Sequence, residues 1–167
     1  MNTEDIIKAD TIEQYNRFFG FETRHPLVGI VHFDGSVPQP THRMTLGFYA
    51  LFLKKATGCI INYGKTVYDF DDETVVSFAP GQTVGIHRLE DGPAPEAIGL
   101  LFHPDFLHRT SLGQKMKQYS FFSYASNEAL HLSTEERIIL QDYMETVASE
   151  LQHPIDKFSK SLIISNI

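Results

Sequence analysis

Short apolar runs separated by turn-forming residues fill the chain from about residue 27 to residue 102, and they constrain the fold more than any other feature. The runs lie at residues 27–33, 46–53, 58–63, 66–70, 73–79 and 97–102. Glycine, aspartate and proline stand between them, as at Pro80-Gly81. Strands at roughly 8–12-residue spacing, joined by such turns, are typical of antiparallel sandwiches and barrels. The segment from Gly81 to Gly85 has no helix after it and is interpreted as a turn.

Helical signals lie on both sides of this region. Asp10 or Thr11 can cap a short helix with Glu13 or Gln14 as capping-box partner. Gly20 then ends that helix. In the C-terminal third, the apolar residues change to helical spacing. Three signals mark helix starts or breaks there: His103-Pro104-Asp105, Ser133-Thr134-Glu135-Glu136 and Pro154.

The chain is therefore expected to be mainly β with C-terminal helices. We predict an N-terminal segment with a short helix over 1–24, an antiparallel barrel or sandwich over 25–110, and a helical segment over 111–167. With 167 residues, 42% of them apolar, the chain is long enough for one sizeable core. The apolar pattern runs to Ile167 without a glycine or basic stop signal. We interpret this as a helix that continues beyond the sequence, which implies a further domain.

Composition argues against several classes of protein. Lys and Arg number 14 and Asp and Glu 21, so the formal net charge is −7, and these residues offer no basic surface for nucleic acid. The single cysteine, Cys59, rules out an internal disulfide and a multi-cysteine zinc site. The first residues are polar and acidic, and no apolar stretch reaches the ~20 residues that span a bilayer. We expect a cytoplasmic protein without a membrane partner.

Motifs for catalysis are missing from the sequence. It has neither a Gly-x-Ser-x-Gly nucleophile motif nor a phosphate-binding loop. A barrel of this kind can hold a metal through clustered histidines and a carboxylate. Met44 stands where a second histidine would follow His42, Ala50 stands where a carboxylate would follow, and His87 is the nearest histidine in the second half. We therefore predict no catalytic residue, metal or cofactor. A cupin-fold metal-dependent isomerase or oxygenase stays open as an alternative.

Four residues are candidates for contact with a small molecule. Arg43 precedes the apolar run 46–53, and its guanidinium can clamp a carboxylate, a phosphate or sugar hydroxyls. Tyr49 can stack or donate a hydrogen bond if it points inward. His42 and His87 flank strands at the expected mouth of the barrel. Alternation places Tyr49 with Leu51 and Leu53 on one face and Phe48, Ala50 and Phe52 on the other, without deciding which face is inside.

Five segments, taken in order, resemble a known domain. They are YGKTVYDF (63–70), FAPGQ (78–82), GLLFHPDF (99–106), YSFFSY (119–124) and NEALHLS (127–133). Together they resemble the N-terminal regulatory domain of AraC-type transcriptional regulators, over a stretch from about residue 25 to the end. The resemblance implies a cupin-like β-barrel that binds a small effector, followed by helices. It also implies a C-terminal domain with two helix-turn-helix motifs that binds DNA, which this sequence does not contain.

The resemblance extends to a few single residues. In a sugar-responsive member, an arginine fifteen residues before a strand-ending glycine contacts the effector, and Arg43 and Gly58 keep that interval. The region 97–99 offers no aromatic platform for a stacked sugar, so the effector is unassigned. Family dimers pair the final helix of this domain, which implies homodimer contacts through Phe158, Leu162 and Ile163. A stand-alone small-molecule binding module is the other alternative.

Overall fold

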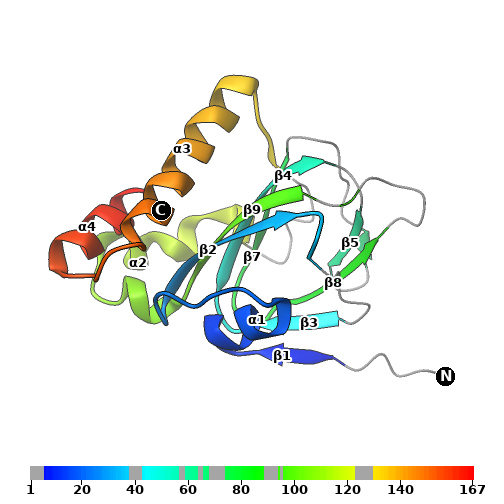
Figure 1. Cartoon of the computed structure of the whole chain (residues 1–167), viewed down its shortest axis with the longest axis horizontal. Coiled ribbons are helices and arrows are strands. Elements are labelled where there is room, and N and C mark those ends of the chain that lie inside the picture. The colour runs from blue at the N-terminus through cyan, green and yellow to red at the C-terminus, as the bar shows by residue number, and fades with distance from the viewer. Residues whose placement is uncertain are drawn as a thin grey trace.

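Two β-sheets and a group of helices make up the described part of the protein (Figure 1). The computed structural model describes residues 6–37, 43–56, 59–63, 66–67, 74–88, 94, 96–122 and 130–167. The strands are β1 (Ile7–Ala9), β2 (Val28–Asp34), β3 (Arg43–Leu46), β4 (Tyr49–Ala56), β5 (Cys59–Tyr63), β6 (Thr66–Val67), β7 (Thr74–Phe78), β8 (Thr83–Arg88), β9 (Glu96–Phe102) and β10 (Leu130–His131).

The helices lie at both ends of the sequence. The α-helices are α1 (Ile12–Phe19), α2 (Ser111–Lys115), α3 (Thr134–Glu150) and α4 (Lys157–Ser165). Three 3-10 turns complete them: η1 (Pro104–Leu107), η2 (Met116–Gln118) and η3 (Ser120–Phe122). None of the described helices combines the length and the apolar character needed to cross a membrane.

The strands form two separate five-stranded sheets. The first sheet has the order β1-β3-β8-β5-β6 and the second has the order β10-β7-β4-β9-β2. Among the described strands, every pairing is antiparallel except that of β1 with β3, which is parallel. Across the described strands the two sheets do not close into a barrel. The expectation of a mainly β fold with C-terminal helices is confirmed.

The second sheet is buried on both faces. One face packs on the first sheet and on α1, and we call this cluster the inter-sheet core; it includes Ile12, Tyr15, Phe33, Met44, Leu46, Phe48, Phe78, Val84 and Leu101. The other face packs on the C-terminal helices, and we call this cluster the sheet–helix core; it includes Leu53, Val75, Leu100, Phe102, Phe106, Met144, Val147 and Ile163. Figure 1 shows α2, α3 and α4 on the side of the second sheet away from β3, β5 and β8.

Strand β4 shows how alternation fills both cores. Phe48, just before the strand, and Ala50 are fully buried in the inter-sheet core, and Phe52 packs against it. Tyr49, Leu51 and Leu53 belong to the sheet–helix core. The predicted alternation is confirmed, and the structure adds that both faces of this strand are inside the protein.

The predicted single strand over 46–53 is wrong at its start. The chain breaks at Gly47-Phe48, so that β3 ends in the first sheet and β4 begins in the second. At this corner the Gly47 N–H donates to the Ala9 carbonyl at 2.8 Å. A Cβ at position 47 would lie 2.4 Å from the Asp10 carbonyl oxygen, so the close approach of two backbone segments requires glycine.

The predicted turn over 81–85 is also wrong beyond its first residues. Gly81 does turn, with φ +86°, but Thr83 begins β8. This strand lies between β3 and β5 in the first sheet. Its glycine and its polar residues obscure the apolar alternation by which the other strands were found, and its place in the sheet comes from pairing with strands distant in sequence.

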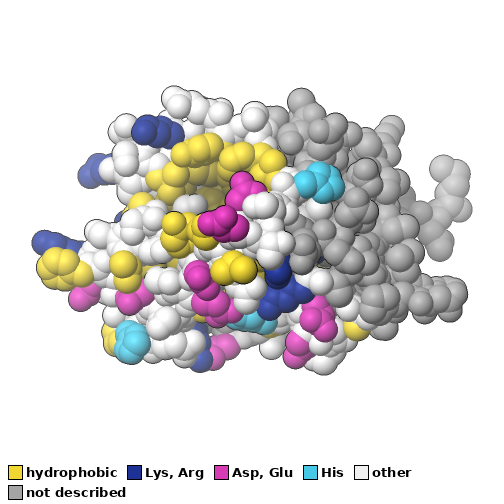
Figure 2. Space-filling model, turned by 90° about the horizontal axis from the view of Figure 1, so that it is seen from above, with side chains coloured by type: hydrophobic (Ala, Val, Ile, Leu, Met, Phe, Trp, Pro, Cys, Tyr) yellow, Lys and Arg dark blue, Asp and Glu magenta, His cyan; other side chains and the backbone are white. Residues whose placement is uncertain are grey.

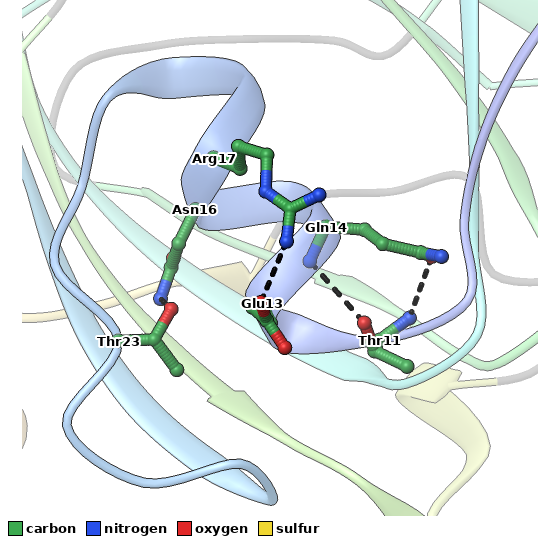
Figure 3. A network of polar contacts seen from close by, with 6 residues as sticks. All are labelled: Thr11, Glu13, Gln14, Asn16, Arg17 and Thr23. Carbon is green, nitrogen blue, oxygen red and sulfur yellow. Dashed lines mark hydrogen bonds and ion pairs between the residues drawn. The ribbon is translucent and has the colours of Figure 1, made fainter.

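The helix signals are confirmed in detail. Thr11 caps α1 and Gln14 completes the capping box, while Gly20 ends the helix with φ 78°. Ser133 and Glu136 form the matching box at the start of α3. Figure 3 shows α1 fastened to the segment that follows it: the Asn16 side-chain amide donates to the Thr23 hydroxyl at 3.0 Å.

Candidate functional site

Arg43 lies at the start of β3, where it pairs with Gly85 of β8. Its neighbour Met44 is buried in the inter-sheet core. Alternation therefore places half-buried Arg43 on the opposite face of the first sheet. Thr45 shares that face, and its hydroxyl lies 2.8 Å from the hydroxyl of Thr83. Arg43 is thus placed away from the space between the sheets.

Tyr49 lies on the far side of the second sheet, facing the helices. Its ring stacks on Phe102, with 5.1 Å between ring centroids and 18° between the planes, and it meets Phe122 edge-on at 5.0 Å. Burial raises the pKa of the Tyr49 hydroxyl, because the charged form is poorly solvated there. Arg43 and Tyr49 belong to different sheets and do not converge on one site.

The side chains of the two predicted histidines, His42 and His87, are not among those that the structure describes. His42 falls outside the described residues. His87 lies in β8 with its backbone opposite Ile60, and its side chain falls outside the description. Among the described residues, no three His, Cys, Asp or Glu side chains come together in the manner of metal ligands.

The described part of the inter-sheet core is filled with aromatic rings. Phe33 meets Phe19 edge-on at 5.4 Å and Phe52 at 6.2 Å. Phe52 in turn lies 6.1 Å from Phe78. These rings come from α1 and the second sheet, and Met44 and Leu46 of β3 and Val84 of β8 pack in the same cluster from the first sheet. This part of the space between the sheets serves as a hydrophobic core.

A cavity of about 590 Å³ opens on the other face of the second sheet, and we call it the sheet–helix cavity. Leu51 of β4 and Phe102 of β9 form its floor. One wall is the stretch from residue 110 to residue 122, with its aromatic rings from Tyr119, Phe121 and Phe122. Its volume lies within the range of small-molecule sites.

The second wall of the cavity is the last helix. Ser161, Ile164 and Ser165 of α4 line it, together with Ile167. On the face seen from above in Figure 2, hydrophobic side chains gather around a hollow. Of the two predicted contact residues with described side chains, Arg43 and Tyr49, Tyr49 lies close to the cavity, because it stacks behind Phe102 and touches Phe122. Sequence reasoning missed the cavity itself. The one local sign of the cavity in the sequence is the presence of hydroxyl side chains within apolar helical segments.

The three predicted dimer residues of α4 divide between surface and interior. Phe158 is 75% exposed and Leu162 is 42% exposed. Ile163 is fully buried in the sheet–helix core. Ile163 therefore anchors α4 to its own chain and is removed from the set of surface residues, whereas Phe158 and Leu162 stay available to a partner.

A smaller cavity of about 440 Å³ lies beside α1. Two of its residues are arginines, and each is paired with a carboxylate: Arg17 with Glu13 at 2.6 Å and Arg24 with Glu22 at 2.8 Å. All four side chains are exposed, so each pair contributes little to stability. Because the positive charges are already balanced, this cavity is not assigned to an anion.

His25 lines the smaller cavity and lies near the last helix, α4. Its Nδ1 accepts a hydrogen bond from the Leu27 N–H at 3.0 Å, and its ring lies edge-on to Phe106 at 5.5 Å. The ammonium of Lys160, on α4, lies 5.5 Å from the centroid of the same Phe106 ring. Burial, and secondly the positive charge of Lys160, lower the pKa of His25 below its usual value of 6.5.

This lowered pKa predicts a loss of stability in acid. As the pH falls below 6.5, the unfolded chain takes up the His25 proton before the folded chain does, so the free energy of unfolding falls until the folded chain is protonated too. His25→Asn, which keeps an acceptor for Leu27, should show a shallower decline in urea unfolding followed over pH. His153→Asn, at an exposed histidine, should keep the wild-type decline. Equal slopes for wild type and His25→Asn would contradict this assignment.

The comparisons with known proteins assign no family. No family model matches the chain, and no curated protein matches it.

Proposed function

We propose that this chain is the effector-sensing and dimerisation domain of a cytoplasmic DNA-binding transcriptional regulator of the AraC type. DNA would be bound only through a C-terminal helix-turn-helix domain outside this sequence. Two things support the proposal: the ordered segments that resemble that family, and the observed fold, mainly β with C-terminal helices. The net charge of −7 agrees with the absence of a DNA-contacting role for these residues.

One observation carries the regulatory part of the proposal: α4 holds both the two exposed residues of the predicted dimer surface and part of the lining of the cavity. Ser161, Ile164 and Ser165 of α4 line the sheet–helix cavity, while Phe158 and Leu162 of α4 are exposed. A molecule in the cavity would therefore touch the helix that presents the dimer surface. Its binding shifts an equilibrium between two positions of α4 only as far as its affinity differs between them.

The test is a gel shift with the full-length gene product on the promoter of its own gene. The wild-type protein should retard this DNA, whereas residues 1–167 alone should not. The double variant F158S/L162S should weaken the shift about tenfold or more, because an apolar pair at a dimer centre contributes strongly to association. F18S, at a 44% exposed phenylalanine on α1, is the matched control and should bind as wild type.

The outcomes separate the proposal from its alternatives. A folded full-length protein that binds no promoter DNA would favour a stand-alone binding module. Equal shifts for wild type and F158S/L162S would remove α4 from the dimer interface. Circular dichroism checks that each variant is folded.

A further inference from the structure

We infer that the sheet–helix cavity binds an uncharged aromatic molecule that carries at least one hydrogen-bond donor, of the class of phenols and aromatic amides. The inference deepens the proposed function and rests on it for its regulatory meaning. It places the effector between the second sheet and α4, rather than in the interior of a barrel.

Contacts within the protein hold the aromatic wall of the cavity together. Phe102 and Phe122 are buried, and their rings lie 6.3 Å apart at 82°. Tyr49 stacks behind Phe102 and holds both rings in place. Phe121 lies 4.7 Å from Phe122 and 5.5 Å from Tyr119, which extends the aromatic wall. Aromatic rings bind another ring favourably in stacked or edge-on geometry.

Three of the five hydroxyls that line the cavity donate a hydrogen bond within the protein. Ser161 donates to the Lys157 carbonyl at 3.1 Å, and Ser165 donates to the Leu162 carbonyl at 2.8 Å. Thr110 donates to the Leu107 carbonyl at 2.7 Å. A hydroxyl that has donated its proton still has lone pairs to offer. Ser161 and Ser165 therefore have acceptors to offer in the cavity, whereas the Thr110 hydroxyl also accepts the Gly113 N–H at 3.0 Å. The two serines match a ligand that donates.

The charge of the lining places a further requirement on the ligand. None of the described residues that line the cavity is an Asp, Glu, Lys, Arg or His. A charged group placed against the buried rings of Phe102 and Phe122 would lose water without gaining a counter-charge, which is costly. The lining therefore disfavours carboxylates, phosphates and amines, and it selects a neutral molecule.

A molecule bound in the cavity would also contact α4 directly. Ser161, Ile164 and Ser165 face the ligand space, and Ile163 between them is anchored in the sheet–helix core. A ligand seated on Phe102 thus fills space between the sheet and the helix, and it favours the α4 position that contacts it best.

The experiment is calorimetry of the chain with three matched probes: 2-naphthol, 2-methoxynaphthalene and 2-naphthoate. 2-Naphthol should bind. 2-Methoxynaphthalene should bind about three- to tenfold more weakly, since it lacks one hydrogen-bond donor. 2-Naphthoate should bind most weakly because its charge has no partner. Equal affinity for the first two probes, or a preference for 2-naphthoate, would overturn the assigned ligand class.

Variants locate the site. S161F places a ring in the cavity and should abolish 2-naphthol binding, whereas S149F, at an exposed serine of α3 that does not line the cavity, should leave it unchanged. The pair S161A/S165A should weaken 2-naphthol about three- to tenfold and leave 2-methoxynaphthalene unchanged. If circular dichroism shows that S161F is unfolded, the alanine pair decides. Unchanged 2-naphthol binding in a folded S161F, or an alanine pair that affects both probes equally, would overturn the site.

The two proposals fail separately. Calorimetry on residues 1–167 requires no DNA, so a chain that binds no 2-naphthol overturns the cavity proposal alone. A full-length protein that binds no promoter DNA overturns the proposed function and leaves the ligand site in place.

Discussion

Replacing Phe48 with alanine should lower the free energy of unfolding by about 3–5 kcal/mol, the usual cost of removing a buried phenylalanine from a core. Phe48 is completely buried at the corner between the two sheets, and its ring meets Tyr15 edge-on at 5.8 Å. The substitution leaves a hole in the inter-sheet core, a cluster built from residues of α1 and of both sheets. The change in the free energy of unfolding is measured by urea unfolding. Far-UV circular dichroism follows the transition, because the chain has no tryptophan whose fluorescence could report it.

The matched control for this change is Phe18→Ala. Phe18 lies on α1 but is 44% exposed, so its removal should change the free energy of unfolding by less than about 0.5 kcal/mol. A loss below about 1 kcal/mol for Phe48→Ala, or similar losses for both variants, would contradict the inter-sheet core as we describe it.

Replacing Gly47 with alanine should cost about 1–3 kcal/mol, although it adds only a methyl group. A Cβ at this position would lie 2.4 Å from the carbonyl oxygen of Asp10 and 2.7 Å from its Cα. Backbone atoms cannot turn aside as a side chain does. The segment that carries β1 must therefore shift, and the bond from the Gly47 N–H to the Ala9 carbonyl must lengthen or break.

Gly29→Ala provides the comparison, because the nearest atom to its added Cβ would be the Ile12 Cγ2 at an ordinary 3.5 Å. Its free energy of unfolding should stay within about 1 kcal/mol of wild type. Hydrogen exchange gives a second measurement: Gly47→Ala should speed exchange of the β1 and β3 amides more than those of β9. Equal destabilisation by the two variants would show that the corner at residue 47 tolerates a side chain.

The elements that sequence could predict are those whose signals are local. Thr11 with Gln14, and Ser133 with Glu136, satisfy helix N–H groups within four residues, so their pattern is readable without the fold. The run 97–102 is equally plain, because a strand in the middle of a doubly covered sheet is apolar almost throughout.

The remainder depends on contacts between distant segments. The break at Gly47 is made by Asp10 and Ala9, nearly forty positions earlier, and nothing beside Gly47 signals it. Arg43 and Tyr49 are six positions apart and looked like parts of one site, yet the corner between them sends them to different sheets. The sheet–helix cavity likewise joins β4, β9, the 110–122 stretch and α4, which meet only in the folded chain.

The burial of the second sheet on both faces has a consequence for how its strands find their alignment. In a sheet with one wet face, a one-residue slip puts apolar side chains into water and is rejected on that ground. Here such a slip of β4 would only exchange one buried set for another. The alignment of the strands must then depend on how well the side chains fit together. Phe52 lies opposite Gly99 of β9, and a Cβ on Gly99 would come within 2.4 Å of the Phe52 ring. We therefore expect the fit of the Phe52 ring over Gly99, which has no side chain, to favour the observed alignment of β4 with β9.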